Sequence, residues 1–213
     1  MRVEIYRVFP KDSDTGRTPN VNTRANSPSD VELLDRDTAK NNLSFSTTLL
    51  NGSFMANNSV LNGIHPKPNQ QTNGEGPVTG QEFRFDVKFT TPILLAPDHY
   101  FFVPQVMLSS GDFFWLSAPR PISGAGTTPF PAGFTDLQEW IRNENLAPDW
   151  SRVGTDIVGG TSPPTFNASF SLTGQTVPEP ASVVMLALGA AGVFVGLRIR
   201  RKRRALALGL ATT

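Results

Sequence analysis

The residues with the greatest capacity for chemistry are two histidines, and neither has the neighbours that a reactive or metal-bound histidine needs. His65 lies in a polar segment, and His99 lies in a turn that leads into an apolar run. No carboxylate stands beside either one at the fixed spacing of a zinc signature. The sequence also lacks the G-x-S-x-G and P-loop motifs. We therefore predict no catalytic residue, no metal site and no cofactor.

A short acidic segment, Asp12-Ser13-Asp14-Thr15-Gly16, begins like a calcium-binding loop. An EF-hand requires glycine at its sixth position and glutamate at its twelfth. Arg17 and Thr23 occupy those positions, so the motif fails. Asp12 and Asp14, together with Asp35 and Asp37, could still bind calcium in an extracellular loop. The favoured interpretation is ordinary turn chemistry, in which aspartate and serine accept hydrogen bonds from nearby backbone.

Composition excludes several classes of protein. The chain of 213 residues has no cysteine, which excludes disulfide scaffolds, iron–sulfur clusters, cysteine-ligated zinc and cysteine nucleophiles. Its formal net charge of +1 argues against a nucleic-acid partner. Glycine and proline number 18 each and phenylalanine 15, a mixture that favours short strands and turns over long helices.

Hydrophobic alternation predicts an all-β domain. The clearest strand is Glu82–Phe89, in which Phe83, Phe85, Val87 and Phe89 share one face and charged residues occupy the other. Antiparallel strands with frequent turns indicate a β-sandwich or jelly-roll. Pro104 places its strand at an edge or a bulge. The other expected strands are 2–9, 43–50, 93–96, 100–108, 113–116 and 165–172, the last with Phe166, Ala168, Phe170 and Leu172 pointing inward.

One short helix is expected near residue 140. Thr135 and Gln138 fit a capping box, and Leu137, Trp140 and Ile141 would share one helical face. Residues 11–30 and 64–80 are expected to be long loops because they carry few apolar side chains and many turn residues.

The C-terminal end differs from the rest of the chain in charge and hydropathy. Residues 1–180 contain 13 basic and 18 acidic residues, whereas the last 33 residues contain six basic residues and no acid. Residues 181–197 carry no charge, and a helix of that length spans about 26 Å. Extended to Ile199, the segment predicts a single transmembrane helix over 181–199. The basic cluster that follows the apolar segment predicts a cytoplasmic C-terminus: Arg198, Arg200, Arg201, Lys202, Arg203 and Arg204.

Four residues stand directly before the apolar segment: Val177, Pro178, Glu179 and Pro180. A V-P-E-P string, a short apolar helix and an arginine cluster, in that order, resemble the PEP-CTERM sorting signal of exported bacterial proteins. Similar tails are also labelled as the C-terminal region of ice-binding proteins, which describes the tail alone. The resemblance implies an inner-membrane precursor whose tail an exosortase, a membrane-embedded protease, processes at Pro178–Pro180. The mature form would lie at the cell surface or in an exopolysaccharide matrix.

The resulting domain prediction is an ectodomain over 1–172, a linker with the V-P-E-P motif over 173–180, a transmembrane helix over 181–199 and a basic tail over 200–213. Export requires a signal peptide, and the charged start Met1–Tyr6 does not read as one. We therefore expect the true start of translation to lie upstream of Met1.

Aromatic residues from Tyr100 onward leave the task of the ectodomain open. Tyr100, Trp115, Trp140 and Trp150 could stack on sugars if exposed, but a domain of this size needs large side chains in its core. We favour a non-catalytic structural or interaction module. The alternatives are a carbohydrate-binding or other ligand-binding sandwich and, less favoured, a hydrolase with paired carboxylates.

Overall fold

The computed structural model of the chain describes residues 1–17, 24, 26–61, 71–119, 138–143, 145–160 and 166–175. The chain divides into two compact units, residues 1–169 and 170–213. All the strands in the described ranges belong to the first unit, and every described pairing is antiparallel. The prediction of an all-β class is confirmed.

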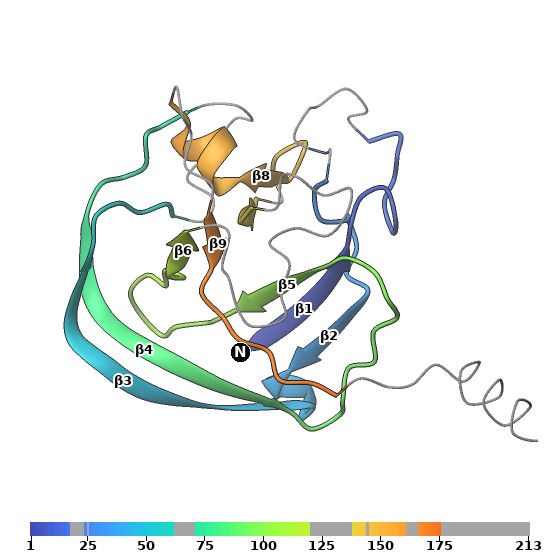
Figure 1. Cartoon of the computed structure of the whole chain (residues 1–213), viewed down its shortest axis with the longest axis horizontal. Coiled ribbons are helices and arrows are strands. Elements are labelled where there is room, and N and C mark those ends of the chain that lie inside the picture. Colours follow the sequence, from blue (N-terminus) through green and yellow to red (C-terminus); the bar gives the residue numbers. More distant parts are fainter. Residues whose placement is uncertain are drawn as a thin grey trace, which may run out of the picture. The chain divides into compact units, whose positions relative to one another are not determined.

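A three-stranded sheet forms the centre of the first unit (Figure 1). The strand β1 (Arg2–Arg7) lies between β2 (Leu34–Asp37) and β5 (Tyr100–Gln105). Both faces of β1 are buried, because Val3, Ile5 and Tyr6 are core residues and Glu4 is buried as well. Pro104, opposite Val3, lies on β5 at the edge of this sheet, as its inability to donate a ladder hydrogen bond predicts. A 3-10 turn, Thr38–Lys40, follows β2.

The longest strands form a separate two-stranded ribbon, drawn as a curved pair in Figure 1. It pairs β3 (Leu43–Ala56) with β4 (Val78–Phe89), which starts inside the predicted loop 64–80. Thr47 lies opposite Phe85, and Leu49 lies opposite Phe83. The predicted alternation in Glu82–Phe89 is confirmed for Phe85, Val87 and Phe89, which are partly buried, while Phe83 stays exposed.

Two smaller pairs complete the described strands. The strand β6 (Ser117–Pro119) pairs with β9 (Phe166–Ala168), and β7 (Trp140–Arg142) pairs with β8 (Trp150–Arg152). A π-helical segment, Val153–Val158, follows β8 and buries Val153 and Ile157. One three-stranded sheet and three ribbons do not establish two packed sheets, so the sandwich or jelly-roll stays a prediction.

The helix predicted near residue 140 is wrong where the structure describes it. Trp140 and Ile141 lie in β7 and pair with Arg152 and Ser151 of β8. Tryptophan and isoleucine are good strand residues, and pairing with a strand ten residues further along the chain overrides the local helical spacing. Thr135 and Leu137 lie outside the described residues.

Three further strand predictions need correction. Residues 93–96 form no strand, and Leu94 and Leu95 are exposed rather than buried. Residues 113–116 form no strand either, because aromatic packing of Phe113 against Phe85 and Trp115 takes the place of a ladder. The strand predicted over 165–172 is limited to β9, and Phe170 and Leu172 beyond it are exposed rather than inward-facing.

The predicted membrane helix over 181–199 and the basic tail over 200–213 lie outside the described residues. Among the helical segments that the structure does describe, none combines the length and apolar character that crossing a bilayer requires.

Candidate functional site

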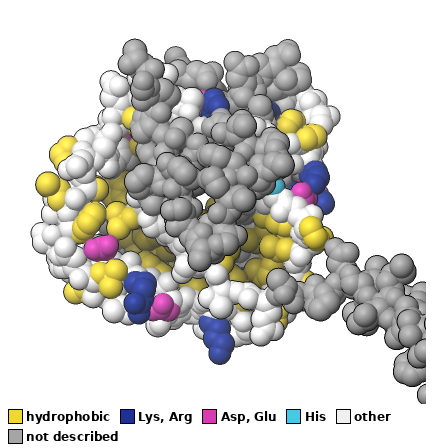
Figure 2. Space-filling model, in the orientation of Figure 1, with side chains coloured by type: hydrophobic (Ala, Val, Ile, Leu, Met, Phe, Trp, Pro, Cys, Tyr) yellow, Lys and Arg dark blue, Asp and Glu magenta, His cyan; other side chains and the backbone are white. Residues whose placement is uncertain are grey.

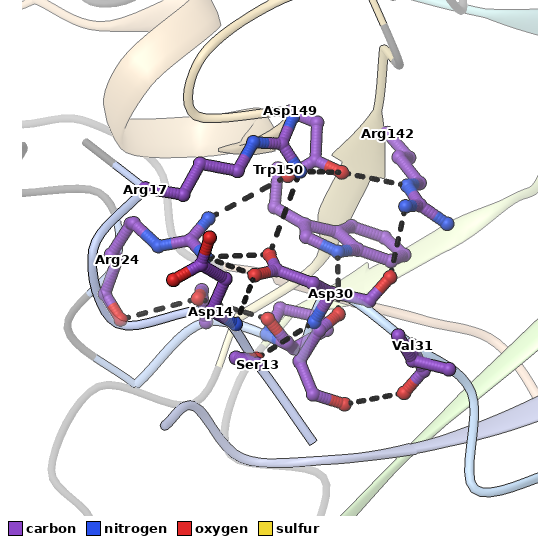
Figure 3. Close-up of polar contacts among 12 residues, drawn as sticks. Ser13, Asp14, Arg17, Arg24, Asp30, Val31, Arg142, Asp149 and Trp150 are labelled. Atoms are coloured by element: carbon purple, nitrogen blue, oxygen red, sulfur yellow. Dashed lines mark hydrogen bonds and ion pairs between the residues drawn. The ribbon is translucent and has the colours of Figure 1, made fainter. Parts of the chain in front are cut away.

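The most elaborate polar constellation in the described part of the chain surrounds Asp149, which directly precedes β8. Asp149 is 1% exposed, and its Oδ2 accepts a hydrogen bond of 2.9 Å from Nε of Arg142 on β7. Arg24 and Arg17 approach the same carboxylate, each with an N–O distance of 3.7 Å. Figure 3 shows the three guanidinium groups converging on this one carboxylate.

A second carboxylate, Asp30, lies beside the first and is paired with two of these arginines, while Arg142 donates to the Asp30 backbone carbonyl. Arg24 donates to both oxygens of Asp30, at 2.5 and 2.6 Å, and Arg17 lies 3.8 Å away. The backbone of Asp30 donates to the hydroxyl of Ser13, and Asp14 donates its backbone N–H to the Asp30 carboxylate (Figure 3). These contacts join the two ends of the predicted loop 11–30. We call Arg17, Arg24, Asp30, Arg142 and Asp149 the arginine–aspartate cluster.

The cluster continues into the central sheet through Tyr6. Arg142 donates to the Tyr6 hydroxyl at 3.1 Å, and that hydroxyl donates to Glu4 at 2.9 Å. Burial and the hydrogen bond to Glu4 raise the pKa of Tyr6 above its ordinary value. The ring of Tyr6 packs edge-to-face on Trp150, whose Nε1 donates to the Ser29 carbonyl. The cluster therefore connects β1, β7, β8 and the 11–30 segment.

The charges in this cluster are matched. Asp30 and Asp149 both face guanidinium groups, so each negative charge lies beside positive ones. Arg24 is only 3% exposed, and its Nε and one terminal nitrogen have no hydrogen-bond partner within the described part of the chain. Because a charge left buried without its partner is strongly destabilising, these ion pairs fix Arg24 and Asp30 beside Asp149.

The four aspartates considered for calcium binding each have a different hydrogen-bond or ion-pair partner. Asp12 is bound by the Arg7 guanidinium, which lowers the pKa of its carboxyl. Asp35 pairs with Lys40, and Asp37 accepts the backbone N–H of Ala39 as the cap of the 3-10 turn. Asp14 accepts the N–H of Gly16. Across the described residues, no three carboxylate or histidine groups gather in a geometry that could hold a metal ion.

His99 lies where its apolar surroundings oppose protonation. Its ring packs on Phe101 with the centroids 5.3 Å apart, and Phe101 in turn contacts Trp140. Burial lowers the pKa of His99, an effect that neighbouring Asp98 partly offsets. Asp98 is itself engaged by Lys11 at 2.6 Å. This setting fits the predicted turn histidine, and His65 lies outside the described residues.

The aromatic residues considered for stacking on sugars pack within the domain rather than standing fully exposed. Trp150 is buried, and Tyr100, Trp115 and Trp140 are partly buried, as are the neighbouring Phe101, Phe102, Phe113 and Phe114. Tyr100 donates to the Ala96 carbonyl, and Trp115 donates to the Ser169 carbonyl. These contacts favour the interpretation of the aromatics as packing residues.

Sequence reasoning did not single out Glu139, which carries the clearest raised carboxyl pKa. Burial raises the pKa of Glu139, while the Ser117 hydroxyl donates to its Oε2 at 2.5 Å and partly opposes that rise. Ser117 comes from β6 and Glu139 from the residue before β7, so the contact joins two ribbons. No local pattern in the sequence signals a contact between positions this far apart.

Relative to the unmodified protein, the Glu139→Gln variant is expected to gain stability as pH rises from 4 to 7. A carboxyl whose pKa is raised by folding contributes stability below its ordinary pKa and loses it as pH rises through the folded value. Glutamine keeps an acceptor for Ser117 and cannot ionise. Urea unfolding of both proteins at pH 4 and pH 7 measures the difference. An advantage of the glutamine variant that is the same at both pH values would contradict the assignment.

The residues predicted for sorting and topology lie outside the described ranges, and their support comes from comparison with known families. Residues 176–202 match the PEP-CTERM protein-sorting motif. No curated protein and no solved structure matches the chain.

The match defines the class of protein: a PEP-CTERM sorting-signal protein, exported and sorted through its C-terminal end. The signal implies membrane association and processing by an exosortase. The matched range contains Val177–Pro180 and four of the six basic residues named above.

Proposed function

We propose that this chain is the membrane-held precursor of a bacterial surface protein whose ectodomain is a non-catalytic structural or interaction module. The observation that carries the proposal is the match of residues 176–202 to the sorting motif. In this proposal residues 1–172 are the ectodomain, 173–180 the linker that presents Val177–Pro180, 181–199 the transmembrane helix and 200–213 the cytoplasmic tail.

The order of residue types in the tail supports these roles for its segments. Proline at 178 and 180 has no backbone N–H and disfavours helix at the residue before it, so we expect the motif to be extended ahead of the proposed membrane helix. Glu179 is the last acidic residue of the chain. The helix would hold this rigid, charged tripeptide at a fixed depth for a membrane-embedded protease. The six basic residues would keep the C-terminus in the cytoplasm.

The chemistry of the described ectodomain is consistent with a non-catalytic role. The most buried carboxylate there, Asp149, is opposed by arginines, and Glu139 has a single hydroxyl partner. A glycosidase needs two carboxyl groups facing one another across a cleft. We propose that the mature ectodomain acts at the cell surface or in the exopolysaccharide matrix by binding rather than by catalysis.

A topology experiment tests the membrane part of this proposal. A reporter that is active only in the cytoplasm, fused after Thr213, is expected to be active. Replacing all six basic residues of the cluster by glutamine should reduce that activity severalfold, because these residues are the strong orientation signal in the tail. Arg84→Gln with Lys88→Gln, two exposed changes on β4, is the control and should leave the reporter unchanged. Activity of a periplasm-only reporter at Thr213 in the unmodified protein would contradict the proposed orientation.

A further inference from the structure

The outer edge of β3 is open within the described part of the chain. β3 forms a sheet with β4 alone, and none of its backbone groups is hydrogen-bonded to another described segment. In an antiparallel ribbon every second residue directs its N–H and C=O away from the partner strand. Each strand of such a ribbon therefore offers a row of donors and acceptors to a further strand.

The composition of β3 does nothing to protect that edge. Its 14 residues, LSFSTTLLNGSFMA, include no charged residue and no proline. Natural edge strands are usually protected by lysine, proline or a very short length. β4 differs, because it carries Glu82, Arg84, Asp86 and Lys88. Because β3 has no charged side chain and β4 has four, a further strand can pair with β3 without removing a charge from water.

The ribbon also exposes a hydrophobic face next to that edge. Phe45 and Leu49 on β3 and Phe83 on β4 are 43, 52 and 43% exposed. Figure 2 shows hydrophobic side chains gathered at the surface along this part of the molecule. The opposite face of β3 carries the hydroxyls of Ser44, Ser46 and Thr48, which are exposed as well. Isolated two-stranded ribbons are marginally stable in water, so an added strand would stabilise this one.

We propose that β3 pairs antiparallel with β3 of a second copy of this chain, forming a continuous four-stranded sheet in the order β4, β3, β3 and β4. A second copy fits because β3 has no charge, so self-pairing brings no like charges together. A two-fold axis normal to the sheet keeps both hydrophobic faces on one side. For pairing centred at Ser46, Ser44 lies opposite Thr48 and Leu43 lies opposite Leu49, while Phe45 lies opposite Thr47 on the hydrophobic face.

The regular part of β3 defines where this pairing occurs. Leu43 to Leu49 pair with β4 in unbroken register, and the register shifts between Leu49 and Asn51 and again before Phe54. Shifts of this kind twist a strand and interrupt its outer edge. The pairing segment is therefore 43–49, centred near Ser46. This inference does not rest on the sorting function, because it concerns the first unit alone.

The test measures self-association of the full chain in detergent by sedimentation across a range of concentrations. Ser46→Lys with Thr48→Lys is expected to weaken the dimer at least tenfold, because pairing about Ser46 sets the lysine at 46 opposite its copy and gathers four positive charges on one face of the sheet. Gln81→Lys with Thr79→Lys adds the same charge at exposed positions of β4 and should leave the dimer unchanged. Both variants keep the whole C-terminal tail, so any association through the tail cancels in the comparison. A wild-type monomer, or equal loss in both variants, would overturn the proposal.

Crosslinking provides a second measurement that does not depend on a disruptive charge. The chain has no cysteine, so Ser46→Cys and Gln81→Cys each introduce a unique thiol at an exposed position. A short bismaleimide is expected to give covalent dimer from the Ser46→Cys variant and little from the Gln81→Cys variant. Equal crosslinking at both positions, or crosslinking through position 81 alone, would contradict pairing through β3.

Discussion

Replacing Asp149 by alanine is expected to destabilise the first unit by about 3–5 kcal/mol, the usual effect of removing one partner from a buried ion pair. The variant would leave the guanidinium of Arg142 without its 2.9 Å hydrogen bond and Arg24 with one carboxylate instead of two. Since Arg24 is nearly fully buried, water cannot replace the lost partner. Urea unfolding followed by circular dichroism measures the change.

A matched control separates this effect from the general loss of a carboxylate. Asp86 on β4 pairs with Arg84 at 3.0 Å, and both side chains are exposed. Asp86→Ala is therefore expected to change stability by no more than about 1 kcal/mol. Asp149→Asn should fall between the two alanine variants, because it keeps the size of the side chain and loses the charge. If Asp149→Ala were as mild as Asp86→Ala, the cluster would not be what holds Arg24 and Asp30 in place.

The second large effect is expected in the sorting motif. Replacing Pro178, Glu179 and Pro180 together by alanine should abolish the mature surface form and leave the precursor in the membrane. Alanine allows the helix to extend back through the motif and removes the last acidic residue of the chain. Immunoblotting of surface and membrane fractions from a bacterial host with an active exosortase measures the ratio of the two forms.

The control for the motif is a change in the preceding linker. Thr173→Ala with Gln175→Ala changes two exposed residues that precede the motif and leaves the motif itself intact. This variant should reach the surface like the unmodified protein. Normal surface levels of the triple-alanine variant would show that Pro178–Pro180 has no part in sorting.

Local pattern was sufficient to predict the parts of the fold that depend on neighbours in sequence. The alternation in Glu82–Phe89 predicted most of β4, and the strand expected over residues 2–9 contains β1. The sorting signal could also be recognised from the sequence, because the V-P-E-P string, the apolar segment and the basic cluster are contiguous, and residues 176–202 match the sorting motif. These signals need no knowledge of tertiary contacts.

The arginine–aspartate cluster could not be predicted in the same way. Arg24 and Asp149 are separated by more than half the chain, and each is an ordinary charged residue in its own segment. The helix predicted near Trp140 was wrong for a related reason, since pairing with β8 decides the backbone there. The burial of Glu4 also has no local signal, because it depends on β1 lying between β2 and β5. Glu4 accepts hydrogen bonds from Tyr6 and from Gln105, and the pairing of β1 with β5 brings Gln105 into reach.

The most direct test of the central claim is mass spectrometry of the C-terminal peptide of the protein recovered from the surface of a host with an active exosortase. We expect the surface form to end at or near Pro178–Pro180, or to carry another anchor there, and to lack residues 181–213. The precursor in the membrane fraction of the same cells should retain them. Recovery of an intact 181–213 segment from the surface material would contradict processing at the motif.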